Sequence, residues 1–88
     1  MDKSTALTNF KKVRTLLDKV IGMVEKDEYC IDIMQQNLAA IGMLKSAHQS
    51  LMEGHLHHCF TKAITSKQEK RKKEMIEEIL KVTKLANK

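Results

Sequence analysis

The sequence contains no proline and no tryptophan, and its three glycines stand apart from one another. Because proline breaks a helix in its interior and clustered glycines mark turns, few positions interrupt a helical chain. Aromatic residues make up only 3% of the sequence, and its apolar residues are mostly Leu, Ile, Val, Ala and Met, which are typical of helix-on-helix packing. We therefore predict an all-α fold.

The sequence also lacks long apolar runs. None approaches the roughly 20 residues that span a bilayer, and the N-terminus has no signal-peptide segment, so we expect a cytoplasmic protein without a membrane partner. A Gly-rich phosphate loop is absent, and the cysteines and histidines fit ligands better than a nucleophile and its base, so we predict no enzymatic activity. The net charge of +5 favours a polyanionic partner without identifying one.

Apolar residues recur every three or four positions in three segments, which predicts three helices. These helices are expected over about residues 5–26, 28–64 and 67–86, the last one opened by the capping box Ser66–Glu69. A chain of 88 residues buries a small fraction of its surface, so a lone copy is marginal. We expect residues 1–88 to form a single domain that oligomerises.

Three possible metal ligands lie on the long second helix. His55 and Cys59 are four residues apart, so their side chains share one face. Cys30 lies 25 residues before His55, which is ~37 Å along a straight helix, so it cannot reach His55 within one rod. Two antiparallel copies would place Cys30 of one chain beside His55 and Cys59 of the other, which predicts a dimer with two equivalent sites.

The chemistry of this donor set favours Cu(I), because thiolates select soft ions and three ligands leave tetrahedral zinc one short. Zn(II) with a water molecule or an added histidine fits the same residues. Without a metal, the cysteines would be small buried hydrophobic residues and His55 a hydrogen-bonded core residue.

The segments Tyr29–Asp32 (YCID) and Gly54–Cys59 (GHLHHC), preceded by Met23–Asp27 (MVEKD), resemble the copper-sensitive operon repressor (CsoR) family and its nickel-, formaldehyde- and persulfide-responsive relatives. The resemblance covers nearly the whole chain. It implies a three-helix protomer with one very long central helix, an antiparallel four-helix-bundle dimer and a homotetramer built as a dimer of dimers. It also implies a Cu(I)-responsive transcriptional repressor that binds operator DNA when metal-free and releases it when Cu(I) binds Cys30 of one protomer with His55 and Cys59 of its partner.

The resemblance also implies residues around the metal. Tyr29 matches a tyrosine that joins the family's hydrogen-bond network beside the metal ligands. The family's spacing from Cys59 to a networked glutamate leads here to Met75, so Glu74 or Glu78 would have to take that role. Each glutamate is equally compatible with an ordinary exposed helix position.

The DNA-binding residues depart further from the family. Relatives carry an Arg-rich stretch with a Gly-Gln dipeptide in the first helix and an arginine in the second, and the corresponding residues here are Lys11, Lys12, Arg14 and Lys45. Lysine neutralises phosphate but lacks the bidentate fork of arginine, so affinity can persist while recognition changes. Alternatives are a sensor of Ni(II) or persulfide, and a metal-buffering helical protein that has lost DNA binding.

Overall fold

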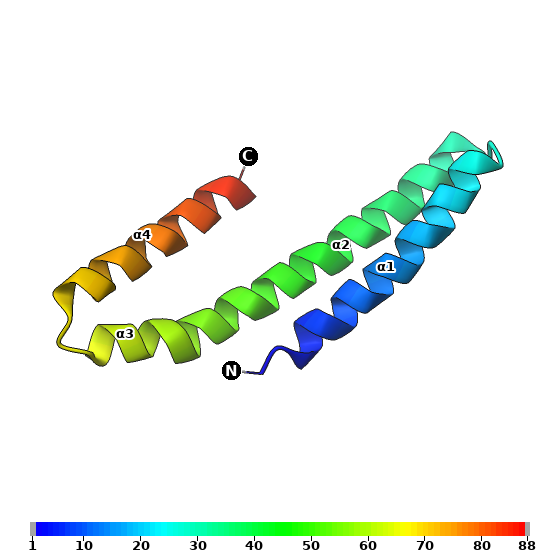
Figure 1. Ribbon diagram of the computed structural model, residues 1–88. Coiled ribbons are helices and arrows are strands. Elements are labelled where there is room, and N and C mark those ends of the chain that lie inside the picture. The colour runs from blue at the N-terminus through cyan, green and yellow to red at the C-terminus, as the bar shows by residue number, and fades with distance from the viewer. Residues whose placement is uncertain (1, 88) are drawn as a thin grey trace. The chain divides into compact units, whose positions relative to one another are not determined.

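The computed structural model describes residues 2–87, without the side chain of Phe60, and throughout this range the regular secondary structure is helical. The elements are α1 (Ser4–Glu25), α2 (Cys30–Gly54), a π-helical segment η1 (His55–Phe60), α3 (Thr61–Thr65) and α4 (Glu69–Ala86) (Figure 1). The all-α prediction is confirmed. Among the helices of residues 2–87, none is long and apolar enough to cross a membrane.

The chain divides into two compact units. The first, Asp2–Glu53, contains α1 and nearly all of α2, and we refer to it as the hairpin unit because the two helices run antiparallel beside each other (Figure 1). The second begins at Gly54 and contains η1, α3 and α4, and we refer to it as the C-terminal unit.

The connection between α1 and α2 is a tight Schellman turn. The Asp27 N–H donates to the Val24 carbonyl and the Glu28 N–H donates to the Met23 carbonyl, both at 3.0 Å, which satisfies two carbonyls at the end of α1. Asp27 adopts a left-handed conformation with φ 55°. Because this turn occupies residues 26–29, α2 begins at Cys30 and not at the predicted residue 28.

The hairpin unit has two apolar sides, of which one is buried. Small and medium side chains dominate the buried side: Ala6, Val13, Met23, Ala40 and Ala47. A second set of large apolar side chains stays exposed, and we refer to it as the outer apolar residues: Leu7, Phe10, Leu17, Ile21 and Val24 of α1, with Ile31, Met34, Leu38, Ile41 and Leu44 of α2. Along α2, the large apolar residues that recur every three or four positions are thus the exposed ones, and the buried residues are the small Ala40 and Ala47.

The C-terminal unit starts inside the long second helix. Backbone helix continues from α2 through η1 and α3 to Thr65, close to the predicted end at residue 64. Among the described side chains of this unit, Ala63 and Met75 are buried.

The predicted capping box at Ser66 does not form. The Ser66 hydroxyl donates to the Ala63 carbonyl at 2.6 Å, and α4 begins at Glu69 with Gln68 as its N-cap residue. The serine thus closes the end of α3 and leaves the start of α4 without a side-chain cap.

Candidate metal-binding site

His55 and Cys59 lie on the π-helical segment, at the first and fifth of its residues. In a π-helix the hydrogen bond runs from i to i+5, so each turn holds more residues than the 3.6 of an α-helix, and side chains four residues apart lie more nearly in line. Both residues are partly buried. His57 and His58, between them, are exposed. The local backbone therefore brings one imidazole and one thiol to the same side of the helix.

Thr61 holds the end of this π turn. Its backbone N–H points at the carbonyl of Leu56, and its hydroxyl donates to the same carbonyl at 2.9 Å. An irregular turn leaves carbonyl groups poorly paired, and a β-hydroxyl at the right position satisfies one of them. The π geometry was not predicted, because the apolar spacing of an α-helix and of one π turn are too similar to separate by sequence.

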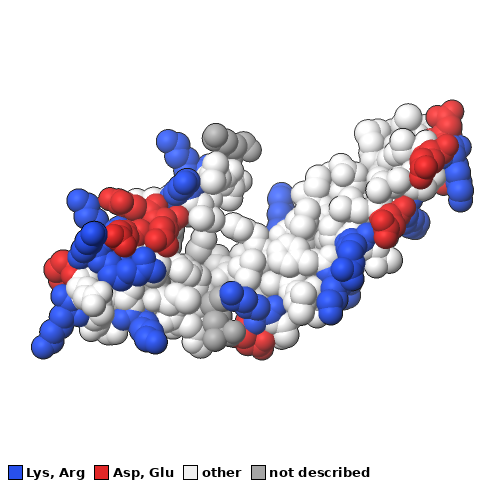
Figure 2. Space-filling model, in the orientation of Figure 1, with Lys and Arg blue, Asp and Glu red and all other residues white. Residues whose placement is uncertain are grey.

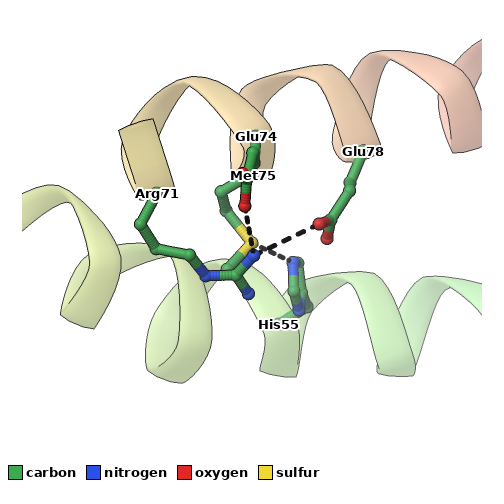
Figure 3. A network of polar contacts seen from close by, with 5 residues as sticks. All are labelled: His55, Arg71, Glu74, Met75 and Glu78. Atoms are coloured by element: carbon green, nitrogen blue, oxygen red, sulfur yellow. Dashed lines mark hydrogen bonds and ion pairs between the residues drawn. The ribbon is translucent and has the colours of Figure 1, made fainter. Parts of the chain in front are cut away.

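Met75 of α4 contacts the imidazole of His55. Its Sδ lies 3.1 Å from His55 Nε2 (Figure 3), and Met75 is only 3% exposed. A thioether has no proton to donate, so this contact is a hydrogen bond when Nε2 carries the proton. Met75, which occupies the position where the family's spacing leads to a glutamate, thus places a sulfur atom against the predicted metal ligand His55.

The glutamates on either side of Met75 are held by Arg71. The Arg71 guanidinium lies 3.5 Å from the Glu74 carboxylate and 3.3 Å from the Glu78 carboxylate (Figure 3). Both glutamates are about half exposed. Their carboxylates are occupied by an ion pair on the surface of α4, whereas the partner of His55 is Met75. A networked role for Glu74 or Glu78 stays a prediction.

Cys30 and Tyr29 belong to the hairpin unit. Cys30 is the first residue of α2, its thiol is free and exposed, and the preceding Tyr29 is 69% exposed. Cys59 is also a free thiol. Within residues 2–87, no three His, Cys, Asp or Glu side chains of one chain come together as a metal site. A site that joins Cys30 of one chain to His55 and Cys59 of another stays a prediction.

The basic residues predicted to contact DNA are exposed. Figure 2 shows Lys and Arg side chains along α1, with acidic side chains among them. At about 100° per residue, Lys11 and Arg14 share one side of α1, while Lys12 projects about 100° from Lys11. Lys45 lies on α2. A contact with DNA through these lysines and this arginine stays a prediction.

The helical hairpin, the long second helix and its Cys and His residues define a class of small all-helical protein with soft-metal donors on its central helix. Residues 2–84 match the family of metal-sensitive transcriptional repressors. The chain belongs to this family.

Curated proteins similar to this chain include copper-sensing repressors. The copper-sensing transcriptional repressor CsoR of Mycobacterium tuberculosis (strain ATCC 25618 / H37Rv) is 39% identical over 62 residues, which are 70% of this chain and 52% of that protein. CsoR of Bacillus subtilis (strain 168) is 34% identical over 65 residues, which are 74% of this chain and 64% of that protein. The matched part of the chain thus spans between about half and two thirds of the length of these curated relatives.

A solved structure extends the likeness to nearly the whole fold. The crystal structure of the copper-sensing repressor CsoR with Cu(I) from Geobacillus thermodenitrificans NG80-2 matches with a TM-score of 0.85 at 30% sequence identity. The match covers 97% of this chain and 85% of that chain. The three-helix layout with one long central helix is therefore shared with a copper sensor.

Proposed function

We propose that this protein is a Cu(I)-responsive transcriptional repressor, which binds operator DNA when metal-free and releases it when Cu(I) binds. The ligands are Cys30 of one protomer with His55 and Cys59 of its partner. The observation that carries the proposal is the pairing of His55 and Cys59 on one π turn, in a chain whose relatives are named as copper sensors.

The donor chemistry supports Cu(I) as the signal. Two free thiols and one imidazole form a soft set, and thiolates favour Cu(I) over the hard ions that carboxylates and carbonyls bind. When bound, Cu(I) would link helices of two protomers through these side chains. The protein supplies the partly buried imidazole and thiol on one rigid turn and an exposed thiol at the start of α2.

The exposed apolar surface supports the assembly that this site needs. Ten outer apolar residues of the hairpin unit are each at least 39% exposed, with Leu38 reaching 64%. Packing such side chains against a second copy is favourable by about 25 cal/mol for each Å² of apolar surface removed from water. An antiparallel pairing of two hairpins would bury them and bring Cys30 to the His55 and Cys59 end of the partner, as the donor spacing requires.

The release of DNA follows from linkage. If Cu(I) binds more tightly to a helix packing that does not fit DNA than to the packing that does, copper favours the first packing. The affinity for DNA then falls by up to the ratio of the Cu(I) affinities of the two packings. The exposed Lys11, Lys12, Arg14 and Lys45 supply positive charge for phosphate contacts, which weaken as salt rises.

The decisive experiment is an anaerobic Cu(I) titration of the protein bound to DNA from upstream of its own gene, followed by fluorescence anisotropy. We expect the anisotropy to fall to that of free DNA as Cu(I) is added, and the variant Cys59→Ala to stay bound to DNA at the same copper concentrations. Full retention of DNA by the copper-loaded wild-type protein would contradict the proposal.

The exposed thiol of Cys30 favours a second candidate, sensing by thiol modification. In that case a sulfur donor would link Cys30 and Cys59 of two protomers covalently. Mass spectrometry after exposure to persulfide separates the two functions, since the copper proposal predicts DNA release without any covalent link. A protein that binds Cu(I) but no DNA at low ionic strength would instead be a metal buffer.

A further inference from the structure

We propose that Met75 is a fourth soft donor of the copper site, so that one chain supplies an imidazole, a thiolate and a thioether from His55, Cys59 and Met75. This inference rests on the proposed function and adds a ligand to it. It also gives the C-terminal unit a donor set of its own, to which Cys30 of the partner contributes from outside.

The first observation is the contact between Met75 and His55. Two ligands of one ion, with bonds of about 2.0 Å to nitrogen and 2.3 Å to sulfur, lie about 3.5 Å apart. Met75 Sδ and His55 Nε2 are 3.1 Å apart, within a few tenths of an ångström of that separation (Figure 3). A small rotation of either side chain therefore suffices for both atoms to face the same ion.

The second observation connects Met75 to the thiol. Cys59 and Met75 line the same shallow cavity of about 360 Å³ within the C-terminal unit. His55 and Cys59 project from the same side of the π turn, and α4 presents Met75 to them from across the unit. Met75 therefore connects the other two donors, because it contacts His55 directly and shares the cavity with Cys59.

The third observation is the chemistry at this position of α4. Met75 is 3% exposed, so its sulfur is held away from water, where a weak neutral donor competes best for a soft ion. The neighbouring carboxylates are turned to Arg71, so no anion on α4 takes the place of the sulfur at His55. A thiolate with neutral nitrogen and thioether donors suits a monovalent soft ion.

The binding of Cu(I) by these donors needs no oxidant or reductant. Cu(I) enters as Cu(I), the Cys59 thiol releases its proton to solvent, and the Met75 thioether binds through a lone pair with no proton to lose. His55 would bind through Nε2 as a neutral imidazole with its proton on Nδ1, so it would release no proton. One proton is therefore released for each copper bound by these three donors.

The test uses full-length protein in which selenomethionine replaces methionine, loaded anaerobically with Cu(I) and measured at the copper K-edge by X-ray absorption. We expect a copper–selenium scattering shell, which only a coordinating methionine produces. The shell should disappear in Met75→Leu and persist in Met43→Leu, a matched change at a partly buried methionine in the middle of α2. Leucine conserves the volume of methionine, so both variants should fold.

Affinity measured by competition with a Cu(I) chelator provides the second readout. Cys30→Ser should bind Cu(I) more weakly but still at one ion per chain, and adding Met75→Leu to it should cost at least about a further tenfold, the lower end of what loss of a supporting metal-site residue costs.

The outcomes separate the two proposals. A protein that binds Cu(I) with no copper–selenium shell, or with equal affinity in Cys30→Ser and Cys30→Ser/Met75→Leu, overturns the role of Met75 and leaves the proposed function standing. A wild-type protein that binds no Cu(I) overturns both. A shell that survives Met75→Leu but disappears in Met43→Leu assigns the selenium to another residue and also overturns the inference.

Discussion

The hairpin unit and the C-terminal unit use their buried residues differently. In the hairpin, Ala6, Ala40 and Ala47 let two helices approach closely, and the larger apolar side chains are left outside. In the C-terminal unit, the buried Met75 contacts His55, and the ion pairs found within residues 2–87 all lie on α4. The hairpin therefore leaves its large apolar side chains exposed, whereas the C-terminal unit buries a sulfur atom against an imidazole.

The largest expected effect is on the affinity for Cu(I), with little effect on the stability of the metal-free protein. Cys59→Ala should weaken Cu(I) binding by more than the 10–100-fold that residues around a metal ligand contribute, because it removes the thiolate itself. Chelator competition measures this affinity. The thermal unfolding midpoint of the metal-free protein should change little, since Cys59 is only partly buried. The control His58→Ala, exposed on the same π turn, should leave the affinity unchanged.

The next effect concerns the outer apolar residues. Leu38→Glu places a charge among them and should raise the dissociation constant of self-association at least about 100-fold, because burying an unpaired charge at an apolar contact is costly. Sedimentation velocity across a concentration series measures it. Ser46→Glu adds the same charge at an exposed position of α2 with no outer apolar residue three or four positions away, and it should leave association unchanged. If both variants self-associate equally, the outer apolar residues do not lie in the interface.

Inside the hairpin, Ala47 has no exposed surface. Ala47→Leu should lower the free energy of unfolding by about 1–3 kcal/mol, because a close-packed helix contact has no room for three more carbon atoms. Urea unfolding followed by circular dichroism measures the change. The same substitution at the exposed Ala39 serves as the control and should stay within about 0.5 kcal/mol of wild type.

A smaller effect of opposite sign is expected at the turn. Asp27 adopts φ 55°, a conformation that glycine reaches without strain. Asp27→Gly should therefore raise the free energy of unfolding by about 0.5–1 kcal/mol, the strain relieved less the extra freedom of glycine in the unfolded chain. If Asp27→Gly is less stable than wild type in the same urea titration, the aspartate side chain stabilises the turn by more than its left-handed backbone destabilises it.

The smallest effect is a pH dependence at the start of α1. The Ser4 N–H donates to the Asp2 carboxylate at 2.9 Å, and this hydrogen bond lowers the pKa of Asp2 in the folded protein. A lowered folded pKa stabilises the fold above the unfolded value, and this stabilisation is lost as the pH falls below about 4. Asp2→Asn should flatten the slope of the unfolding midpoint against pH in that window and leave the midpoint at pH 7 nearly unchanged.

Much of the helical layout was predictable from the sequence, because without proline the apolar spacing runs uninterrupted through each helix. The first helix was predicted within one residue at each end, and the end of the long second helix also within one residue. The sequence could not tell which apolar side of α1 packs within the chain, since Leu7 and Phe10 are as apolar as Ala6 and Val13. Burial was decided by how closely two helices can approach, and small residues favour close contact.

The site was predictable only in part. The pairing of His55 with Cys59 follows from a spacing of four, and both residues do lie on one turn. The contact between His55 and Met75 joins residues twenty positions apart, across the turn at residues 66–68, and no periodicity encodes such a contact. The capping box at Ser66 fails because α4 begins two residues later than predicted, so the Ser66 oxygen accepts from the N–H of the N-cap residue Gln68, at 3.4 Å, and not from the first turn of the helix.

The Schellman turn at Asp27 also sets the order in which this protein acquires its structure. Contacts across a tight turn are close in sequence, and such local contacts form fast, within microseconds to milliseconds in helical proteins. Covering the outer apolar residues with a second copy requires two chains to meet, so its rate grows with protein concentration. In the proposed dimer, the turn of a newly made chain therefore forms before the shared site, and the protein concentration governs how soon that site is assembled.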